Sequence, residues 1–79
     1  MRTLKKIDWS MTGQNIKHYL RIRGITKKRL AEKIGVTPNT ITIWMSGRRR
    51  IATEYMYLLT QALDVTFEQL VVAEGEGRE

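Results

Sequence analysis

Residues 36–50, VTPNTITIWMSGRRR, combine hydrogen-bonding side chains with a run of positive charge. If the first half of this segment is a helix, Asn39, Thr42 and Ile43 face outward next to three successive arginines. Amide and hydroxyl groups can donate hydrogen bonds to, and accept them from, the polar atoms of a ligand, and arginine side chains bind phosphate. The segment therefore indicates a surface that recognises a polyanion, and the secondary structure of the segment decides whether this surface forms.

The same segment is compatible with two secondary structures. As a strand, its isoleucines alternate with other residues, and Thr, Ile and Trp all favour extended structure. As a helix, Thr37 caps the start, Pro38 occupies the first turn, and Ile41 and Trp44 share one face. No other segment of the chain alternates in this way, so a strand here would have no partner for its backbone groups. The sequence therefore predicts a helix over residues 38–45.

The composition gives little support to catalysis. The chain has one histidine, His18, no cysteine, and no group of acidic residues close to His18 in sequence. A nucleophilic or metal site needs more partners than these. Without cysteine, neither a disulfide nor a thiolate metal site can add to the small core. We therefore expect that the protein is not an enzyme and has no catalytic residue, no cofactor and no metal.

Apolar spacing, cap residues and glycines divide the chain into five expected helices. The first is expected from Gly13, after an N-cap at Thr12, to Arg23. The others are expected at residues 27–34, 38–45, 53–63 and 66–70, with caps at Thr26 and Thr37 and a capping box from Thr66 to Gln69. With short connections, this pattern predicts an all-α fold, a compact bundle of about five short helices.

Charge and composition divide the 79 residues into unequal parts. Residues 1–53 hold thirteen Lys and Arg against two acidic residues, and residues 54–79 hold one arginine against six acidic residues. The resulting net charges of +11 and −5 predict a basic working face and a different role for the C-terminal part. We expect an N-terminal arm at residues 1–12, one domain at residues 13–72 and a polar, disordered tail at residues 73–79.

The spacing from Lys27 onward is specific to one supersecondary unit. Counting Lys27 as the first position, a small residue occupies the fifth position and a glycine the ninth. Ala31 allows the second helix to cross closely, and Gly35 can take a positive φ in the turn. The positions expected to pack between the two helices are all apolar: Leu30, Ile34, Val36, Ile41 and Trp44. The spacing therefore predicts a helix-turn-helix.

With its flanking helices, the unit resembles the lambda-repressor/Cro-like (XRE-type) helix-turn-helix family over residues 13–72, including GITKKRLAEKIGVTPNTI and ALDVTFEQL. In that family the second helix of the unit enters the major groove of DNA, and the first lies across the backbone. By position, the resemblance places Pro38, Asn39, Thr42 and Ile43 nearest the bases. Asn39 suits adenine, Thr42 can donate or accept at a base edge, and Ile43 suits either a thymine methyl group or packing against protein.

The resemblance also implies phosphate contacts around the reading helix. The first position of the unit is a lysine where the family often has a glutamine at phosphate, and three arginines directly follow the reading helix. The expected phosphate contacts are Lys27, Lys28, Thr37, Thr40, Arg48, Arg49 and Arg50. Secondary candidates are Arg2, Lys5, Lys6 and Lys17.

The family pattern is not followed at Leu20 and Met45, nor at Ile51 and Ala52, where the family commonly has Pro-Ser. The family often carries an arginine at the position of Leu20, paired with a glutamate at the position of Met45. Loss of one partner would leave a buried charge unpaired, whereas replacement of both by apolar residues can be neutral or stabilising. We therefore expect Leu20 and Met45 to pack in the core.

The resemblance implies a sequence-specific regulator of transcription that binds double-stranded DNA, expected to be a repressor. A homodimer would hold two reading helices about 34 Å apart, with Leu70, Val71 and Val72 as the candidate interface. The alternative is an antitoxin-like or other partner-binding module that regulates its own promoter, with a toxin or an anti-repressor as its protein partner. No apolar run approaches the roughly 20 residues of a membrane span, so we expect no membrane partner and a cytoplasmic, nucleoid-associated protein.

Overall fold

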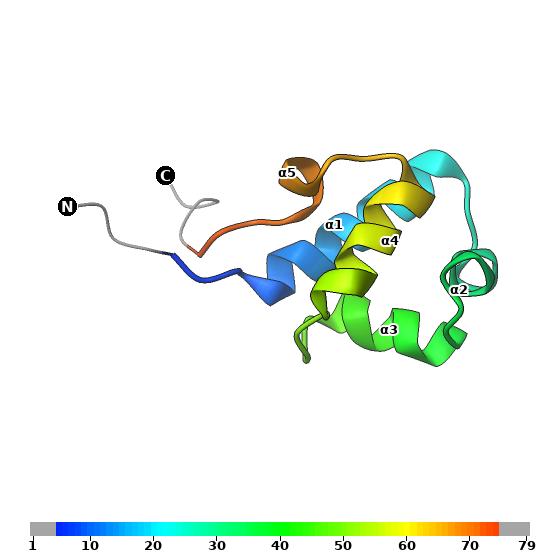
Figure 1. Ribbon diagram of the computed structural model, residues 1–79, viewed down its shortest axis with the longest axis horizontal. Coiled ribbons are helices and arrows are strands. Elements are labelled where there is room, and N and C mark those ends of the chain that lie inside the picture. The colour runs from blue at the N-terminus through cyan, green and yellow to red at the C-terminus, as the bar shows by residue number, and fades with distance from the viewer. Residues whose placement is uncertain (1–4, 75–79) are drawn as a thin grey trace.

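The computed structural model describes residues 5–74, and Figure 1 shows their arrangement as a bundle of five α-helices. The helices are α1 (Trp9–Arg23), α2 (Lys27–Ile34), α3 (Pro38–Ser46), α4 (Thr53–Leu63) and α5 (Phe67–Leu70). The expected all-α class is confirmed, and residues 38–45 form a helix rather than a strand. No helix in the described part of the chain is long and apolar enough to cross a membrane.

The unit formed by α2 and α3 has the caps that its sequence predicts. The Thr26 hydroxyl accepts a hydrogen bond from the Arg29 backbone N–H at 3.1 Å, and the Thr37 hydroxyl accepts one from the Thr40 N–H at 3.2 Å. Gly35 takes a φ of 91° between the two helices, in the left-handed region that glycine adopts without strain. These local signals set the direction in which α3 leaves the turn.

The start of α1 differs from the expected one by four residues. Asp8 is the N-cap, and its carboxylate accepts a hydrogen bond from the Met11 backbone N–H at 2.9 Å. Thr12 is not a cap but is buried inside the helix, where its hydroxyl accepts a hydrogen bond from the Val72 backbone N–H at 3.1 Å. The expected start at Gly13 is wrong because the C-terminal segment supports one more helical turn than the local sequence signals indicate.

The two described ends of the chain pair with each other on the side of the molecule opposite α2 (Figure 1). Ile7 and Ala73 form an antiparallel bridge, and the Glu74 backbone N–H donates to the Lys6 carbonyl oxygen at 2.8 Å. The Asp8 backbone N–H donates to the Val72 carbonyl oxygen at 2.7 Å on the other side of the bridge, so the start of the expected tail is held against the expected arm. The remaining parts of the expected arm and tail lie outside the described residues: 1–4 and 75–79.

A glycine marks the place where α1 crosses α3. A Cβ atom at Gly13 would lie 2.6 Å from the Met45 carbonyl oxygen and 2.7 Å from that of Trp44, so a larger residue would force the two helices apart. At the end of α3, Gly47 has a φ of 75°, and a Cβ atom there would lie 2.6 Å from the Ser10 Cα. This close crossing presses one face of α3 against the bundle and leaves the other outward.

All five helices contribute to a single core. Its buried apolar residues are Ile16, Leu30, Ala31, Ile41, Trp44, Ile51, Met56, Leu59, Leu63, Val65 and Leu70. Leu20 and Met45 pack against this core in half-buried positions, as the sequence predicts. Leu70 is fully buried, so its expected place in a dimer interface is wrong: it anchors α5 to the core, while Val71 and Val72 are half-buried.

Candidate nucleic-acid interface

The outward face of α3 carries three of the four expected base readers. Pro38, Asn39 and Thr42 are exposed, whereas Ile41 and Trp44 of the same helix are buried. An α-helix with its side chains is about 10–12 Å across, which matches the roughly 12 Å width of the major groove. The exposed face of α3 therefore has the shape and the polar groups to enter that groove.

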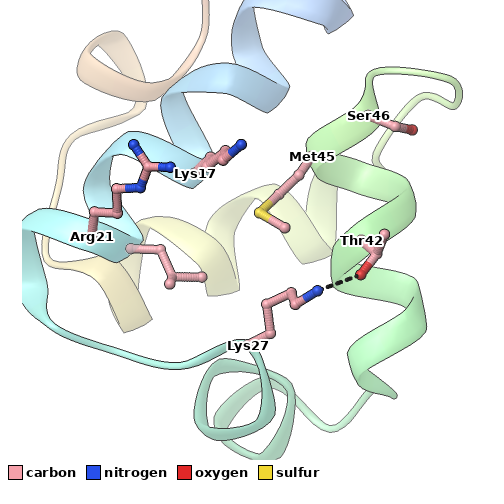
Figure 2. Close-up of a pocket in the computed structure, with 7 residues that line it drawn as sticks. Lys17, Arg21, Lys27, Thr42, Met45 and Ser46 are labelled. Atoms are coloured by element: carbon pink, nitrogen blue, oxygen red, sulfur yellow. Dashed lines mark hydrogen bonds between the residues drawn. The ribbon is translucent and has the colours of Figure 1, made fainter.

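Lys27 and Thr42 are already in contact across the helix-turn-helix. The Lys27 ammonium donates to the Thr42 hydroxyl at 3.2 Å (Figure 2). That hydroxyl donates its proton to the Pro38 carbonyl oxygen at 3.3 Å. Because its one proton is used inside α3, the Thr42 hydroxyl can offer an outside partner only an acceptor lone pair. A base that Thr42 contacts in this geometry must supply the donor.

Ile43 is half-buried, unlike the other expected base readers. It lines a hollow of about 370 Å³ between α3 and the start of α4, together with Thr40, Arg49 and Tyr55 among others. The Tyr55 ring also packs against the Trp44 ring at a centroid distance of 5.3 Å. Ile43 thus contacts its own domain and keeps part of its side chain open, so both of its expected roles are compatible with this position.

The expected phosphate contacts surround α3 on both sides. Lys27 and Lys28 are exposed on the first turn of α2, and three exposed arginines, Arg48, Arg49 and Arg50, follow Gly47 in the loop before α4. Thr37 and Thr40 are less available, because their hydroxyl oxygens lie 3.0 Å apart in a hydrogen bond to each other. The cations are thus exposed at the surface, whereas the two threonines are engaged with each other at the start of α3.

A second group of cations lies beside this face and was largely missed by sequence reasoning. A solvent-open hollow of about 440 Å³ between α1, α2 and α3 is lined by Lys17, Leu20, Arg21, Lys27, Thr42, Met45 and Ser46 (Figure 2). The sequence indicates Lys17 only as a secondary candidate and does not single out Arg21. The available signal is their i, i+4 spacing on α1, which places both side chains on one side of the helix.

The expected arm adds further basic residues near the loop after α3. Lys5, Lys6 and Arg50 line one hollow of about 650 Å³, together with Trp9 and Glu74 among others. Arg2, the remaining secondary candidate, lies outside the described residues. Within residues 5–74, no group of three or more His, Cys, Asp or Glu side chains could hold a metal ion.

The geometry of this face can be compared with known proteins. The family model described as Helix-turn-helix matches residues 16–70, which is more than half of the chain. The chain belongs to the helix-turn-helix family. This helix-turn-helix protein is accordingly a DNA-binding transcriptional regulator, and its family points to regulation rather than to an enzyme activity. No curated protein sequence matches the chain significantly.

Solved structures share the fold of this helix-turn-helix protein. The restriction-modification controller protein C.AhdI from Aeromonas hydrophila has a TM-score of 0.75 at 22% identity, over 80% of this chain and 96% of its own. The clp gene regulator ClgR from Corynebacterium glutamicum has a TM-score of 0.77 at 19% identity, over 85% of this chain and 71% of its own.

A third similar structure is CoII HppE in complex with substrate, with a TM-score of 0.77 at 17% identity. The match covers 82% of this chain but only 36% of the HppE chain, so the shared fold is a minor part of HppE. At these identities the three structures show a common fold, and the position of the exposed face of α3 within that fold carries the functional argument.

Proposed function

We propose that this helix-turn-helix protein is a sequence-specific repressor that reads the major groove of double-stranded DNA with α3. The observation that carries the proposal is the exposed polar face of α3, which lies between Lys27 and Lys28 on one side and the exposed arginines after Gly47 on the other. Cations on both sides of a reading helix can bind the two phosphate backbones that border the groove. A protein bound in this way over a promoter excludes the polymerase and represses transcription.

Each exposed side chain of α3 has a distinct role in the proposal. The Asn39 amide makes paired hydrogen bonds with adenine, and Pro38 shapes the first turn rather than reading a base. Thr42 accepts from a base amino group, since its own proton is donated to the Pro38 carbonyl oxygen. The open part of Ile43 contacts a thymine methyl group. Thr37 and Thr40 act through the helix N-terminus, whose backbone N–H groups attract a phosphate.

We further propose that two copies bind one operator with two-fold symmetry. Tyr57 and Phe67 are large apolar residues with 61% and 52% exposure, and they lie on α4 and α5 rather than on the helix-turn-helix unit. Phe67 and half-buried Val71 line one hollow, and in a two-fold dimer these residues of one copy would pack against the same residues of the second copy. An interface there leaves both reading helices free for DNA, and binding to the chromosome would make the protein nucleoid-associated in the cytoplasm.

A second candidate is a partner-binding module that regulates its own promoter through the same unit. The hollow beside Ile43 and Tyr55, and the exposed Ile22 and Phe67, support it, because an antitoxin-like protein needs an apolar surface for its partner. In this candidate function the toxin or anti-repressor would bind apolar residues, and DNA would bind the same cations as above.

Selection of DNA from a random double-stranded pool, followed by sequencing, tests the proposal. We expect an enriched palindrome, which would support both sequence-specific reading and two-fold symmetry. A variant with Asn39→Ala and Thr42→Ala should keep weak binding to the pool and lose the enrichment, because its phosphate contacts remain. If the unaltered protein enriches no sequence at physiological salt, sequence-specific reading is wrong, and the partner-binding candidate is favoured.

A further inference from the structure

The hollow between α1, α2 and α3 has an apolar base and a cationic rim (Figure 2). Leu20 and Met45, its two apolar lining residues, are half-buried and pack against the core, so they form its base. Lys17, Arg21 and Lys27 are exposed and form its rim. In Figure 2 the Met45 side chain points from α3 into the space between the three helices.

The chemistry of the lining restricts what can bind. Three cations and no carboxylate line the hollow, so an anion is favoured over a neutral or cationic ligand. A bare phosphate gains from the cations but nothing from Leu20 and Met45, because a hydrated anion is not stabilised by apolar surface. A ligand that has one carboxylate and an apolar tail satisfies both parts of the lining. The volume of about 440 Å³ lies in the range of ordinary small-molecule sites.

We propose that this hollow binds a small amphipathic carboxylate, such as a medium-chain fatty acid, with its tail on Leu20 and Met45 and its carboxylate between the rim cations. Lys27 and Thr42 line the hollow and also belong to the proposed DNA face, and they are hydrogen bonded to each other at 3.2 Å. A carboxylate that draws the Lys27 ammonium to itself removes that cation from the DNA backbone. The ligand therefore competes with DNA, and this second step rests on the proposed function.

The first experiment uses the full chain without DNA and octanoate as the probe. With ¹³C-labelled methionine methyl groups, octanoate should shift the Met45 resonance and leave those of Met11 and Met56 in place, because neither of these lines the hollow. Acetate and inorganic phosphate should bind at least roughly tenfold more weakly, since burial of even two methylene groups accounts for about that factor. Octanol, which has the tail without the charge, should also bind roughly tenfold more weakly.

Three outcomes would overturn the proposal. They are a Met45 resonance that does not move, equal shifts of Met11, Met45 and Met56, and equal affinities for octanoate and phosphate. The last result would mean that the hollow binds anions without using its apolar base. A displaced Met45 resonance with the expected order of affinities supports the site whether or not the protein binds any DNA.

Matched double variants test the rim. Lys17→Ala with Arg21→Ala removes two exposed cations from α1, and alanine favours the helix, so the fold should persist. This variant should bind octanoate roughly tenfold more weakly. Arg29→Ala with Lys33→Ala removes the same charge from exposed positions of α2 that do not line the hollow, and it should bind octanoate as the unaltered protein does. Equal losses in both variants would mean that net charge alone attracts the anion.

The competition is measured on the selected operator by fluorescence anisotropy. At ten times its own dissociation constant, octanoate should raise the apparent Kd for DNA roughly tenfold, and acetate at the same concentration should not. An unchanged Kd for DNA, with octanoate bound at Met45, would overturn the competition. If the protein binds no DNA sequence, the proposed function fails instead, and the methyl titration still decides the ligand site.

Discussion

Asn39 is the residue on which the proposed base reading depends most directly. It is exposed on the first turn of α3, where no described hydrogen bond engages its side chain. We predict that Asn39→Ala loses about 1–3 kcal/mol of binding free energy on the selected operator, because a bidentate contact to adenine is lost. Binding to random DNA should change little, since the cations remain. Fluorescence anisotropy with both DNAs measures the two affinities.

The control for this variant is Gln61→Ala, which removes an exposed amide from α4. It should bind both DNAs with unchanged affinity. Equal losses of Asn39→Ala on operator and random DNA would show that Asn39 supports the fold or the backbone contact rather than reading a base.

Replacement of Gly13 by alanine has two opposed effects on the free energy of unfolding, and they differ in size. Alanine is favoured over glycine inside a helix by about 1 kcal/mol. A Cβ atom there would, however, lie 2.6 Å from a backbone oxygen of α3, and forced overpacking costs about 1–3 kcal/mol or more. We predict that Gly13→Ala lowers the free energy of unfolding, measured by urea denaturation. Gln14→Ala, at the next and exposed position, should stay within about 0.5 kcal/mol of the unaltered protein.

Two residues that sequence reasoning misread, Thr12 and Gly13, have distant partners. Thr12 has the side chain of a good N-cap, yet its hydroxyl binds the backbone of Val72, sixty residues away in sequence. Gly13 follows Thr12 and so resembles the first residue of a helix, but it lies inside α1, where the absence of a Cβ atom allows α3 to approach. Asp8 follows a local rule as the N-cap, but the residues after it lack a clear helical period, so the sequence does not predict a helix start there. Sequence patterns describe neighbours in the chain, so contacts made by folding escape them.

At the scale of elements, α2, α3 and α5 follow their local signals closely. Thr26, Thr37 and Thr66 each cap the helix that was expected, and Thr66 forms the full capping box with Gln69. These elements were predictable because a cap, a positive-φ glycine and an apolar stripe act within a few residues. The exposure of Pro38, Asn39 and Thr42 follows from the helix once its buried face is known. The half-burial of Ile43 does not, since it depends on the path of the loop that follows.

The loop after α3 should account for a measurable part of the salt dependence of DNA binding. Arg49 and Arg50 are exposed there, directly after the reading helix. Each phosphate contact adds about 0.9 to the slope of log K against log salt. We predict that Arg49→Ala with Arg50→Ala weakens operator and random DNA alike and flattens this slope by up to about 2.

Affinities measured between low and physiological salt give the slope for this variant. The pair Arg29→Ala with Lys33→Ala has the same net charge but changes exposed positions of α2 that are not among the proposed phosphate contacts, and it should keep a slope close to that of the unaltered protein. An unchanged slope for the arginine variant would remove both residues from the DNA interface.

For the whole molecule, the charge asymmetry of the sequence agrees with the different roles proposed for the helices: DNA binding for the first three and contact between copies for the last two. The basic first part contains α1 to α3, which carry the proposed DNA face, and the acidic second part contains α4 and α5. An acidic surface is repelled by DNA, so the second part is the natural place for contact between two copies. Composition could predict this division, but it could not predict which apolar residues stay exposed. Leu70 is buried, and Phe67 is exposed.

Two-fold binding makes a prediction about DNA length. In a palindromic operator the two half-sites should be centred about one helical turn, or a multiple of it, apart. We predict that insertion of about five base pairs between them reduces affinity to that of a single half-site, because the second half-site then faces the opposite side of the duplex. Insertion of about ten base pairs serves as the control for spacing alone. Equal affinities for the original and the five-base-pair insertion would indicate that single copies bind independently.

The pairing of the two described chain ends also has a consequence for synthesis on the ribosome. The caps of α2 and α3 are local, so these helices can form while translation continues. The first turn of α1, by contrast, is held by Val72, and Leu70 closes the core beneath it, so both must emerge before the N-terminal turn is fixed. A product that stops before residue 70 would contain every proposed base and phosphate contact and would still leave the Thr12 hydroxyl without its backbone donor. Leu70 and Val72 therefore determine when the first helix is complete.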